Sequence, residues 1–276
     1  MAPVKFDDIS KTASEVLNDD FKTSGYEFKA KQKTTWDGAV VTSTFDLFPS
    51  NSDIMTPAKL SWKLPTPLKT NFVCIDKLEM DKAGKFKLEA STDKLYEKLK
   101  VDAKSDLKDP AKISAGLTYS GVPDTLIKFE TTLMKPEAFT AEITRAAGQA
   151  TFGAKFGLAN ITAPDLGARY AQGPFFGSLL CKEKLSTFNA SASYKVSPEV
   201  KCAVTADYGG KKSGQFGFGI AYDVVKGTKL KLKVQHDQSL SFSVKHDVAK
   251  GFNILAGGKF NNLKKDYSYG ISLSVE

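Results

Sequence analysis

The sequence has few of the residues that build catalytic, metal or disulfide-linked sites. Its 276 residues include three cysteines and two histidines. Cys74, Cys181 and Cys202 are odd in number and far apart, which argues against a disulfide framework or a zinc site. His236 and His246 each precede an aspartate, but no nucleophile motif accompanies either pair. The sequence therefore predicts no enzyme, no metal site and no cofactor.

Long apolar segments are also missing. Nowhere do about 18 consecutive apolar residues occur, so no transmembrane helix is expected. Residues 1–17 lack the apolar core of a secretory signal, which argues against the bacterial outer membrane. Lys and Arg number 39 against 31 Asp and Glu, a net charge of +8. This excess favours anionic partners but does not choose among nucleotides, phosphate, nucleic acid and acidic lipid.

Residues 1–25 differ from the rest of the chain. Apolar residues recur there at steps of three and four, which is typical of one face of a helix: Phe6, Ile9, Ala13, Val16 and Leu17. Acidic side chains lie in the first turn, where the helix dipole favours them. The pattern breaks between Asn18 and Gly25, so we expect an N-terminal helix and a linker over residues 1–25.

From Tyr26 onward the apolar period changes to two. In the last segment Tyr267, Tyr269 and Ile271 alternate with small or polar residues, and many earlier segments behave alike. Turns rich in Gly, Pro, Asp and Lys separate about nineteen segments of roughly ten residues, a length that suits tilted strands crossing a bilayer. We expect an all-β membrane protein, a transmembrane β-barrel over residues 26–276, because only closure removes sheet edges that lipid cannot satisfy.

Alternation assigns the polar side of each strand to the interior of this barrel. Basic residues outnumber acidic ones on that side, and rings of basic side chains select anions. A simpler interpretation is that each lysine only solvates a water-filled wall. The predicted anion pathway consists of Lys29, Lys31, Lys59, Lys63, Lys85, Lys87, Lys98, Lys100, Lys155, Arg169, Lys195, Lys201, Lys229, Lys231, Lys233 and Lys245, together with Lys11 of the helix.

Both ends of the chain resemble one family. The run from Phe6 to Leu17 resembles the opening of eukaryotic mitochondrial porins, the voltage-dependent anion channels. The run from Ser268 to Val275 resembles the signal read by the mitochondrial barrel-insertion machinery, carried here by Ser268, Gly270, Ile271, Leu273 and Val275. Residues 221–259 resemble the penultimate hairpins of the family. Nineteen strands are already established for this family, so the strand count is not independent of the resemblance.

The resemblance implies a voltage-gated, weakly anion-selective pore in the mitochondrial outer membrane for ATP, ADP, phosphate and other small metabolites. It implies a helix folded into the lumen, with Asp8, Lys11 and Glu15 at family positions of like charge. The first strand would pair in parallel with the last. The implied partners are membrane lipid, nucleotides and inorganic anions, with no nucleic acid; a homo-oligomer and association with other outer-membrane proteins stay open.

Some features depart from the family pattern. The glycine-rich hinge after the helix is reduced to Gly25, with Asp19, Asp20 and Lys22 around it. A Gly-Leu-Lys triplet tied to nucleotide contact is replaced near residues 97–100, and residues 72–75 offer no lipid-facing glutamate.

Two other functions remain open from the sequence. One is the protein-conducting barrel of the outer-membrane import machinery, against which the basic interior argues. The other is a soluble all-β protein that binds anionic ligands or nucleic acid, which would bind polyanions in a salt-dependent way.

Overall fold

The computed structural model describes residues 3–35, 38–47, 57–65, 72–81, 84–210 and 214–276. The described chain opens with a 3-10 turn, η1 (Phe6–Asp8), and one short helix, α1 (Lys11–Leu17). A second 3-10 turn, η3 (Leu158–Asn160), lies between two strands. No helix among the described residues is long and apolar enough to span a membrane.

Nineteen strands make up the rest of the described chain. They are β1 (Gly25–Lys33), β2 (Val40–Asp46), β3 (Pro57–Leu64), β4 (Cys74–Asp81), β5 (Phe86–Tyr96), β6 (Leu99–Asp106), β7 (Asp109–Tyr119), β8 (Thr125–Thr132), β9 (Lys135–Ala147), β10 (Ala150–Gly157), β11 (Asp165–Gln172), β12 (Phe175–Lys182), β13 (Thr187–Lys195), β14 (Val200–Tyr208), β15 (Gln215–Val225), β16 (Thr228–Gln235), β17 (Ser239–Ala249), β18 (Phe252–Asn261) and β19 (Asp266–Val275).

These strands form a single 19-stranded sheet in which β1 also pairs with β19, so the fold is a closed β-barrel. Neighbours in sequence pair antiparallel, as β1 does with β2 and β17 with β18. An odd number of strands that each reverse direction leaves β1 and β19 pointing the same way. The predicted strand number and the predicted pairing of the first and last strands are both confirmed.

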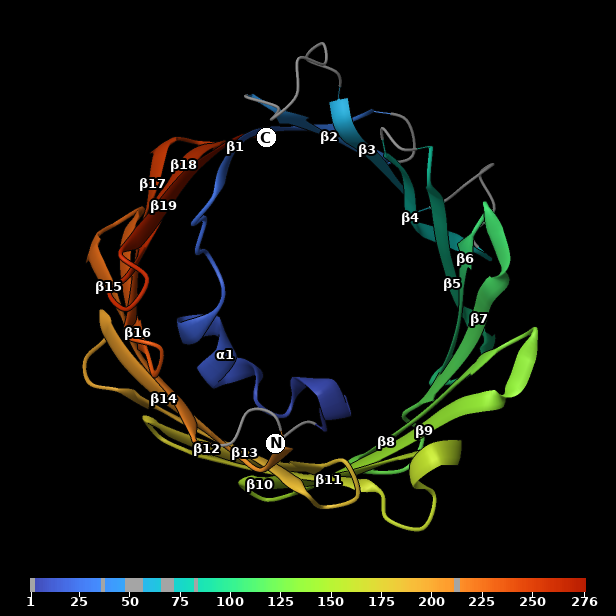
Figure 1. Cartoon of the computed structure of the whole chain (residues 1–276). Helices are drawn as coiled ribbons and strands as arrows, with labels where there is room; N and C mark the ends of the chain where they lie inside the picture. The colour runs from blue at the N-terminus through green and yellow to red at the C-terminus, as the bar shows by residue number, and fades with distance from the viewer. Residues whose placement is uncertain (1–2, 36–37, 48–56, 66–71, 82–83, 211–213) are drawn as a thin grey trace. The chain divides into compact units, whose positions relative to one another are not determined.

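The chain divides into two compact units, and the division runs within β1, β9 and β19. Unit 1 comprises residues 1–25 and 142–272, and unit 2 comprises residues 26–141 and 273–276. In unit 1, η1 and α1 lie against the strands, with α1 on the inner side of β12–β15 (Figure 1). The side of the unit 1 strands on which η1 and α1 lie is called the helix-bearing face, and the opposite side of the unit 1 strands is called the outward face.

The predicted apolar stripe of the N-terminal segment anchors it to the helix-bearing face. Ala13, Val16 and Leu17 form one buried cluster with Phe176, Ala203 and Ala221 of the strands. Phe6 and Ile9 form a second cluster with Leu180, and Ile9 is 0% exposed. Burial of this stripe, rather than helix propensity, holds so short a helix, because isolated helices of this length are not stable in water.

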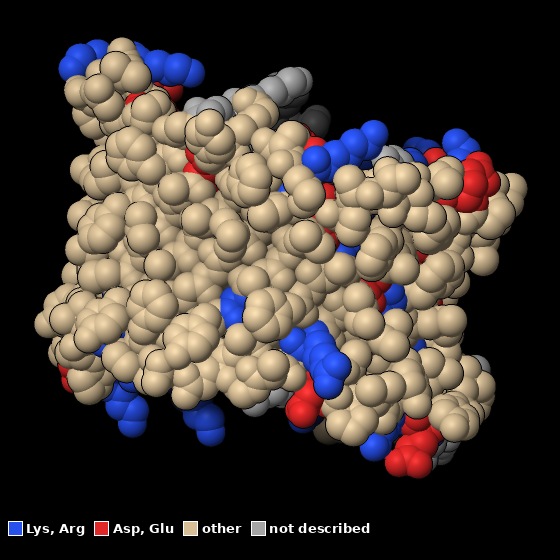
Figure 2. All heavy atoms as spheres, turned by 90° about the horizontal axis from the view of Figure 1, so that it is seen from below, with Lys and Arg blue, Asp and Glu red and all other residues tan. Residues whose placement is uncertain are grey.

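The outward face is mainly apolar. Leu179, Phe218 and Leu232 are 45%, 44% and 43% exposed there, and such exposure is typical of side chains that meet lipid. On the molecular face drawn in Figure 2, acidic and basic side chains gather mainly along two opposite borders, and other residues form most of the surface between them.

Candidate functional site

The candidate site is the helix-bearing face of unit 1 together with the segment that lies on it. Glycines on the strands make room for that segment. A Cβ atom added at Gly167 would lie 2.6 Å from Cδ1 of Ile9, and one at Gly219 would lie 2.9 Å from Cδ2 of Leu17. An added methyl group at either glycine would therefore force the Ile9 or Leu17 side chain to shift.

Lys231 of β16 holds the end of the helix. Its Nζ donates to the carbonyl oxygen of Glu15 at 2.7 Å and to that of Asp19 at 3.0 Å. The last carbonyls of a helix have no intrahelical partner and carry the negative end of its dipole, so a cation is favourable there. The Lys231 side chain is only 6% exposed, which makes it part of the docking contact rather than a free pore charge.

The linker after the helix forms a second contact, which we call the Asp20 clasp. The carboxylate of Asp20 lies 3.1 Å from Lys245 Nζ and 3.6 Å from Lys231 Nζ. Burial alone would raise the pKa of Asp20, but the hydrogen bond from Lys245 and the charges of both lysines outweigh it and lower the pKa. Asp20 is therefore ionised at neutral pH and ties the linker to β16 and β17. A neighbouring bond runs from Lys233 Nζ to Asn18 Oδ1 at 3.1 Å.

A third contact fixes the start of the chain. Lys155 of β10 bridges Glu142 of β9 at 2.9 Å and Asp7 of η1 at 3.2 Å. The hydroxyl of Thr144 donates to the carbonyl oxygen of Val4. The N-terminal segment is thus tied to the wall at both ends by charge and between them by apolar packing.

A cavity of about 440 Å³ lies between α1 and β11–β16. Lys195, Lys201 and Lys229 line one side of it, and Thr12, Glu15 and Asp19 belong to the N-terminal segment on the other. Lys195 and Lys201 are directly opposite each other in the β13–β14 register. Among the described residues neither side chain has an ion pair or a hydrogen bond, whereas Lys229 pairs with Asp223 at 3.4 Å.

All but two of the sequence-predicted pathway residues fall into three groups. On the helix-bearing face of unit 1 lie Lys155, Arg169, Lys195, Lys201, Lys229, Lys231, Lys233 and Lys245. On one face of unit 2 lie Lys29, Lys31, Lys59, Lys63, Lys87 and Lys100; the registers align all of them with polar residues except Lys63, which lies opposite Val40. Lys11 lies on α1, is 60% exposed and pairs with Asp8 at 3.7 Å.

Two predicted strand residues lie elsewhere. Lys98 has a φ of +60° and forms the hairpin turn between β5 and β6, so it is not a wall residue. Lys85 precedes β5 and closes a turn, where its backbone N–H donates to the Asp81 carboxylate. Strand alternation therefore does not assign either side chain to a face of the wall, and their place in the anion pathway stays a prediction.

Many predicted cations are neutralised by carboxylates. In unit 2, Lys59 lies 2.9 Å from Glu79, and Lys29 lies 2.7 Å from Glu27. Lys31 pairs with Glu276 near the chain end. The net positive field of the unit 2 face is therefore weaker than a count of its lysines suggests. Lys195 and Lys201 of unit 1 differ, because neither has a carboxylate partner among the described residues.

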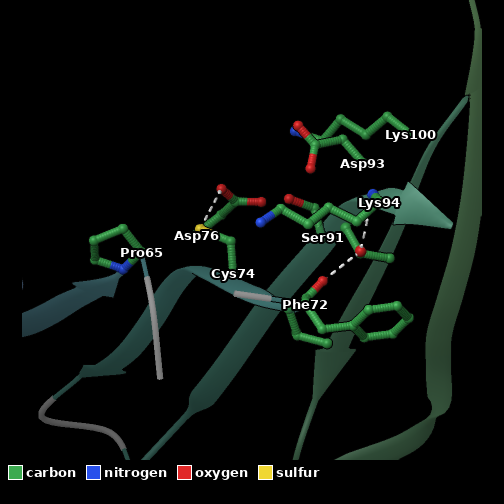
Figure 3. A pocket seen from close by; sticks show the side chains of 10 residues that line it. Pro65, Phe72, Cys74, Asp76, Ser91, Asp93, Lys94 and Lys100 are labelled. Atoms are coloured by element: carbon green, nitrogen blue, oxygen red, sulfur yellow. Dashed lines mark hydrogen bonds between the residues drawn. The ribbon is translucent and has the colours of Figure 1, made fainter. Parts of the chain in front are cut away.

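Unit 2 also carries a pocket of about 340 Å³ at the start of β4 (Figure 3). The Cys74 thiol lies 3.6 Å from Asp76 Oδ1, and the Thr92 hydroxyl donates to the carbonyl oxygen of Phe72. Asp93 and Lys100 lie nearby, so the pocket carries mixed charge. No group of three or more His, Cys, Asp or Glu in the described part of the chain could hold a metal ion.

The predicted insertion signal forms β19. A Cβ atom at Gly270 would lie 2.7 Å from the carbonyl oxygen of Gly25, so glycine lets the linker pass close to the strand.

Sequence reasoning missed Asp7 and Asp20 as contact residues. Their partners, Lys155 and Lys245, lie 148 and 225 positions away, and no local pattern reveals such pairs.

Known proteins resemble this chain to different degrees. The family model for eukaryotic porins matches residues 2–270. The mitochondrial outer membrane protein porin of Candida albicans is 25% identical over 99% of both chains. Among solved structures, a porin of Rhodopseudomonas blastica aligns with 90% of this chain and 94% of its own at 7% identity and a TM-score of 0.48. OmpT of Vibrio cholerae, lacking one loop, aligns with 90% and 95% at 9% identity and a TM-score of 0.37. The chain belongs to the eukaryotic porin family and is a pore-forming β-barrel channel of the mitochondrial outer membrane, not an enzyme.

Proposed function

We propose that this channel is a voltage-gated, weakly anion-selective diffusion pore for ATP, ADP, phosphate and other small metabolites. The observation that carries the proposal is the pair Lys195 and Lys201. Like charges directly opposite each other in a sheet are unfavourable. These two lysines lie on the polar face beside a cavity and have no carboxylate partner among the described residues. Mobile anions are therefore the counterions that would offset their repulsion.

Weak rather than strong selectivity follows from the ion pairs. Glu27, Glu79 and Glu142 each lie within 3 Å of a lysine and cancel part of the basic charge. A confined pore still sums the remaining field, so the excess of cations should bias conduction toward anions. The bias should be modest, because water in a wide pore screens each exposed charge.

The docking of the N-terminal segment supports voltage gating. Asp7, Lys11 and Glu15 move with this segment, and each elementary charge that crosses the membrane potential contributes about 2.3 kcal/mol per 100 mV. The Asp20 clasp and the Lys155 bridge are charge contacts that a field can weaken. Release of the segment into the pathway would change the open area without breaking the sheet.

Reconstitution of the purified chain tests the proposal. Vesicles loaded with ATP and carrying the channel should release ATP, while vesicles without protein should retain it. In planar bilayers the conductance should fall stepwise as the voltage rises in either direction. A pore that passes chloride but excludes ATP would contradict the metabolite role, and a conductance independent of voltage would contradict gating.

A further inference from the structure

One charged side chain stands apart on the outward face of unit 1. Along the described strands of this unit the outward positions carry apolar, small or uncharged polar residues, such as Ile143 and Phe152. Arg145 of β9 is the exception. It lies between Thr144 and Ala146, which are 1% and 5% exposed on the helix-bearing face, and it is itself exposed. Alternation therefore directs Arg145 to the side that meets lipid.

Arg145 has no protein partner among the described residues, neither an ion pair nor a hydrogen bond. His246 also faces outward, but its Nδ1 lies 2.8 Å from the Thr228 hydroxyl. A guanidinium carries a full charge and five N–H donors, and hydrocarbon offers no partner for either. A charged side chain on the lipid face of a barrel destabilises the fold at the membrane centre, but its free-energy cost is close to zero at the membrane interface.

The place of Arg145 along its strand resolves this conflict. It lies two residues before the end of β9 at Ala147. With a rise of about 3.3 Å per residue and a tilt of about 40°, its Cα atom lies roughly 5 Å inside the strand end. An extended arginine side chain spans that distance and brings its guanidinium to the level of the lipid phosphates.

The neighbouring outward residues suit a lipid headgroup. Phe152, Tyr170 and Phe175 are 57%, 41% and 44% exposed on the same face. The register places Tyr170 opposite Ala150 at the start of β10, next to the β9–β10 turn. The Tyr170 hydroxyl donates to Gln149 of that turn at 2.9 Å. Aromatic rings with polar tips mark the membrane interface, and arginine binds a phosphate through two parallel hydrogen bonds.

We propose that Arg145, flanked by Phe152 and Tyr170, is a binding site for the headgroup of an anionic phospholipid on the outer wall of the barrel. The occupant is a lipid rather than a soluble anion because the site lies on the apolar, lipid-facing side of the strand. A net negative headgroup is favoured over a zwitterionic one because the single guanidinium then has no cationic competitor in the same lipid.

Native mass spectrometry of the full chain tests this site. The protein is purified in a non-ionic detergent and mixed with equal amounts of phosphatidylglycerol and phosphatidylcholine. The wild type should retain phosphatidylglycerol preferentially, and Arg145→Gln should reduce that retention about fivefold, which corresponds to about 1 kcal/mol for one cation near an anionic headgroup. Arg145→Lys keeps the charge but loses the planar fork, so its retention should exceed that of the Gln variant.

Lys182→Gln is the matched control, since it removes one charge from an exposed position at the end of β12 on the helix-bearing face. It should retain phosphatidylglycerol as the wild type does. Equal retention by the wild type and Arg145→Gln would overturn the proposal. The same holds if Lys182→Gln loses as much lipid, or if phosphatidylcholine is retained as well as phosphatidylglycerol.

Discussion

Ile9 provides a direct test of how the N-terminal segment is held. Its side chain is 0% exposed and packs with Phe6 and Leu180 against the wall. Truncating a fully buried isoleucine to alanine costs about 2–5 kcal/mol, because the transfer of apolar atoms is lost and a cavity remains. In the released segment this side chain is exposed to water, so the cost falls mainly on the docked state. The lower limit corresponds to about a 30-fold rise in the released fraction of Ile9→Ala.

Limited trypsin digestion of the reconstituted channel measures that fraction. Cleavage after Lys11 requires the helix to leave the wall and unfold, and it tracks the released population when docking is faster than cleavage. Thr12→Ala is the matched control, because Thr12 is exposed on the same helix and makes no buried contact. The rate of cleavage at Lys11, followed by mass spectrometry, should rise at least about 30-fold in Ile9→Ala and stay near wild type in Thr12→Ala. Equal rates in the two variants would refute the packing argument.

Three further predictions concern the same segment. Asp20 has a pKa in the folded state that the two lysines hold below the ordinary aspartate range, so its stabilising effect is present at neutral pH and is lost as the pH falls through that lowered pKa. Hydrogen exchange over residues 11–20, corrected for intrinsic rates, should become faster in the wild type as Asp20 is protonated. The Asp20→Asn variant should already exchange faster at pH 7, and its rate should show no such change with pH. Gly167→Val should displace Ile9 and increase cleavage after Lys11 as Ile9→Ala does; unchanged cleavage would mean that the close approach is not required. Deletion of residues 1–20 should alter the voltage dependence and leave an assembled barrel, and loss of the barrel in circular dichroism would show that the segment is needed for folding.

Alternation predicted the strands and their faces well, because the side-chain period of a strand is two and one face is uniformly apolar. The stripe from Phe6 to Leu17 was equally clear, and each of its five apolar residues is buried. Failures occurred where the period is interrupted. Lys98 occupies a turn with positive φ, and a β-bulge lies between Ile75 and Lys77 of β4. A bulge adds one residue and reverses the parity that follows it.

The docking contacts could not be predicted from the sequence. Asp20 and Lys245 lie on segments that meet only after the sheet has formed, and several acids and lysines were equally available to each. In the sequence, Asp19 and Asp20 indicate only that the glycine-rich hinge of the family is reduced. Asp20 is instead an anchoring residue, held between two lysines. The same limit explains why Lys231 was assigned to the pathway, although it binds the end of the helix.

The central claim is that the unpaired basic residues of the polar face set the ion preference. The reversal potential of single channels in a gradient of potassium chloride tests it most directly, with the wild type compared with Lys195→Glu combined with Lys201→Glu. The wild-type potential should lie toward the equilibrium potential of chloride, and the double variant should shift toward that of potassium, since neither lysine contacts α1 by a hydrogen bond or ion pair in the described structure. A wild-type potential on the potassium side, or no shift in the variant, would contradict the account.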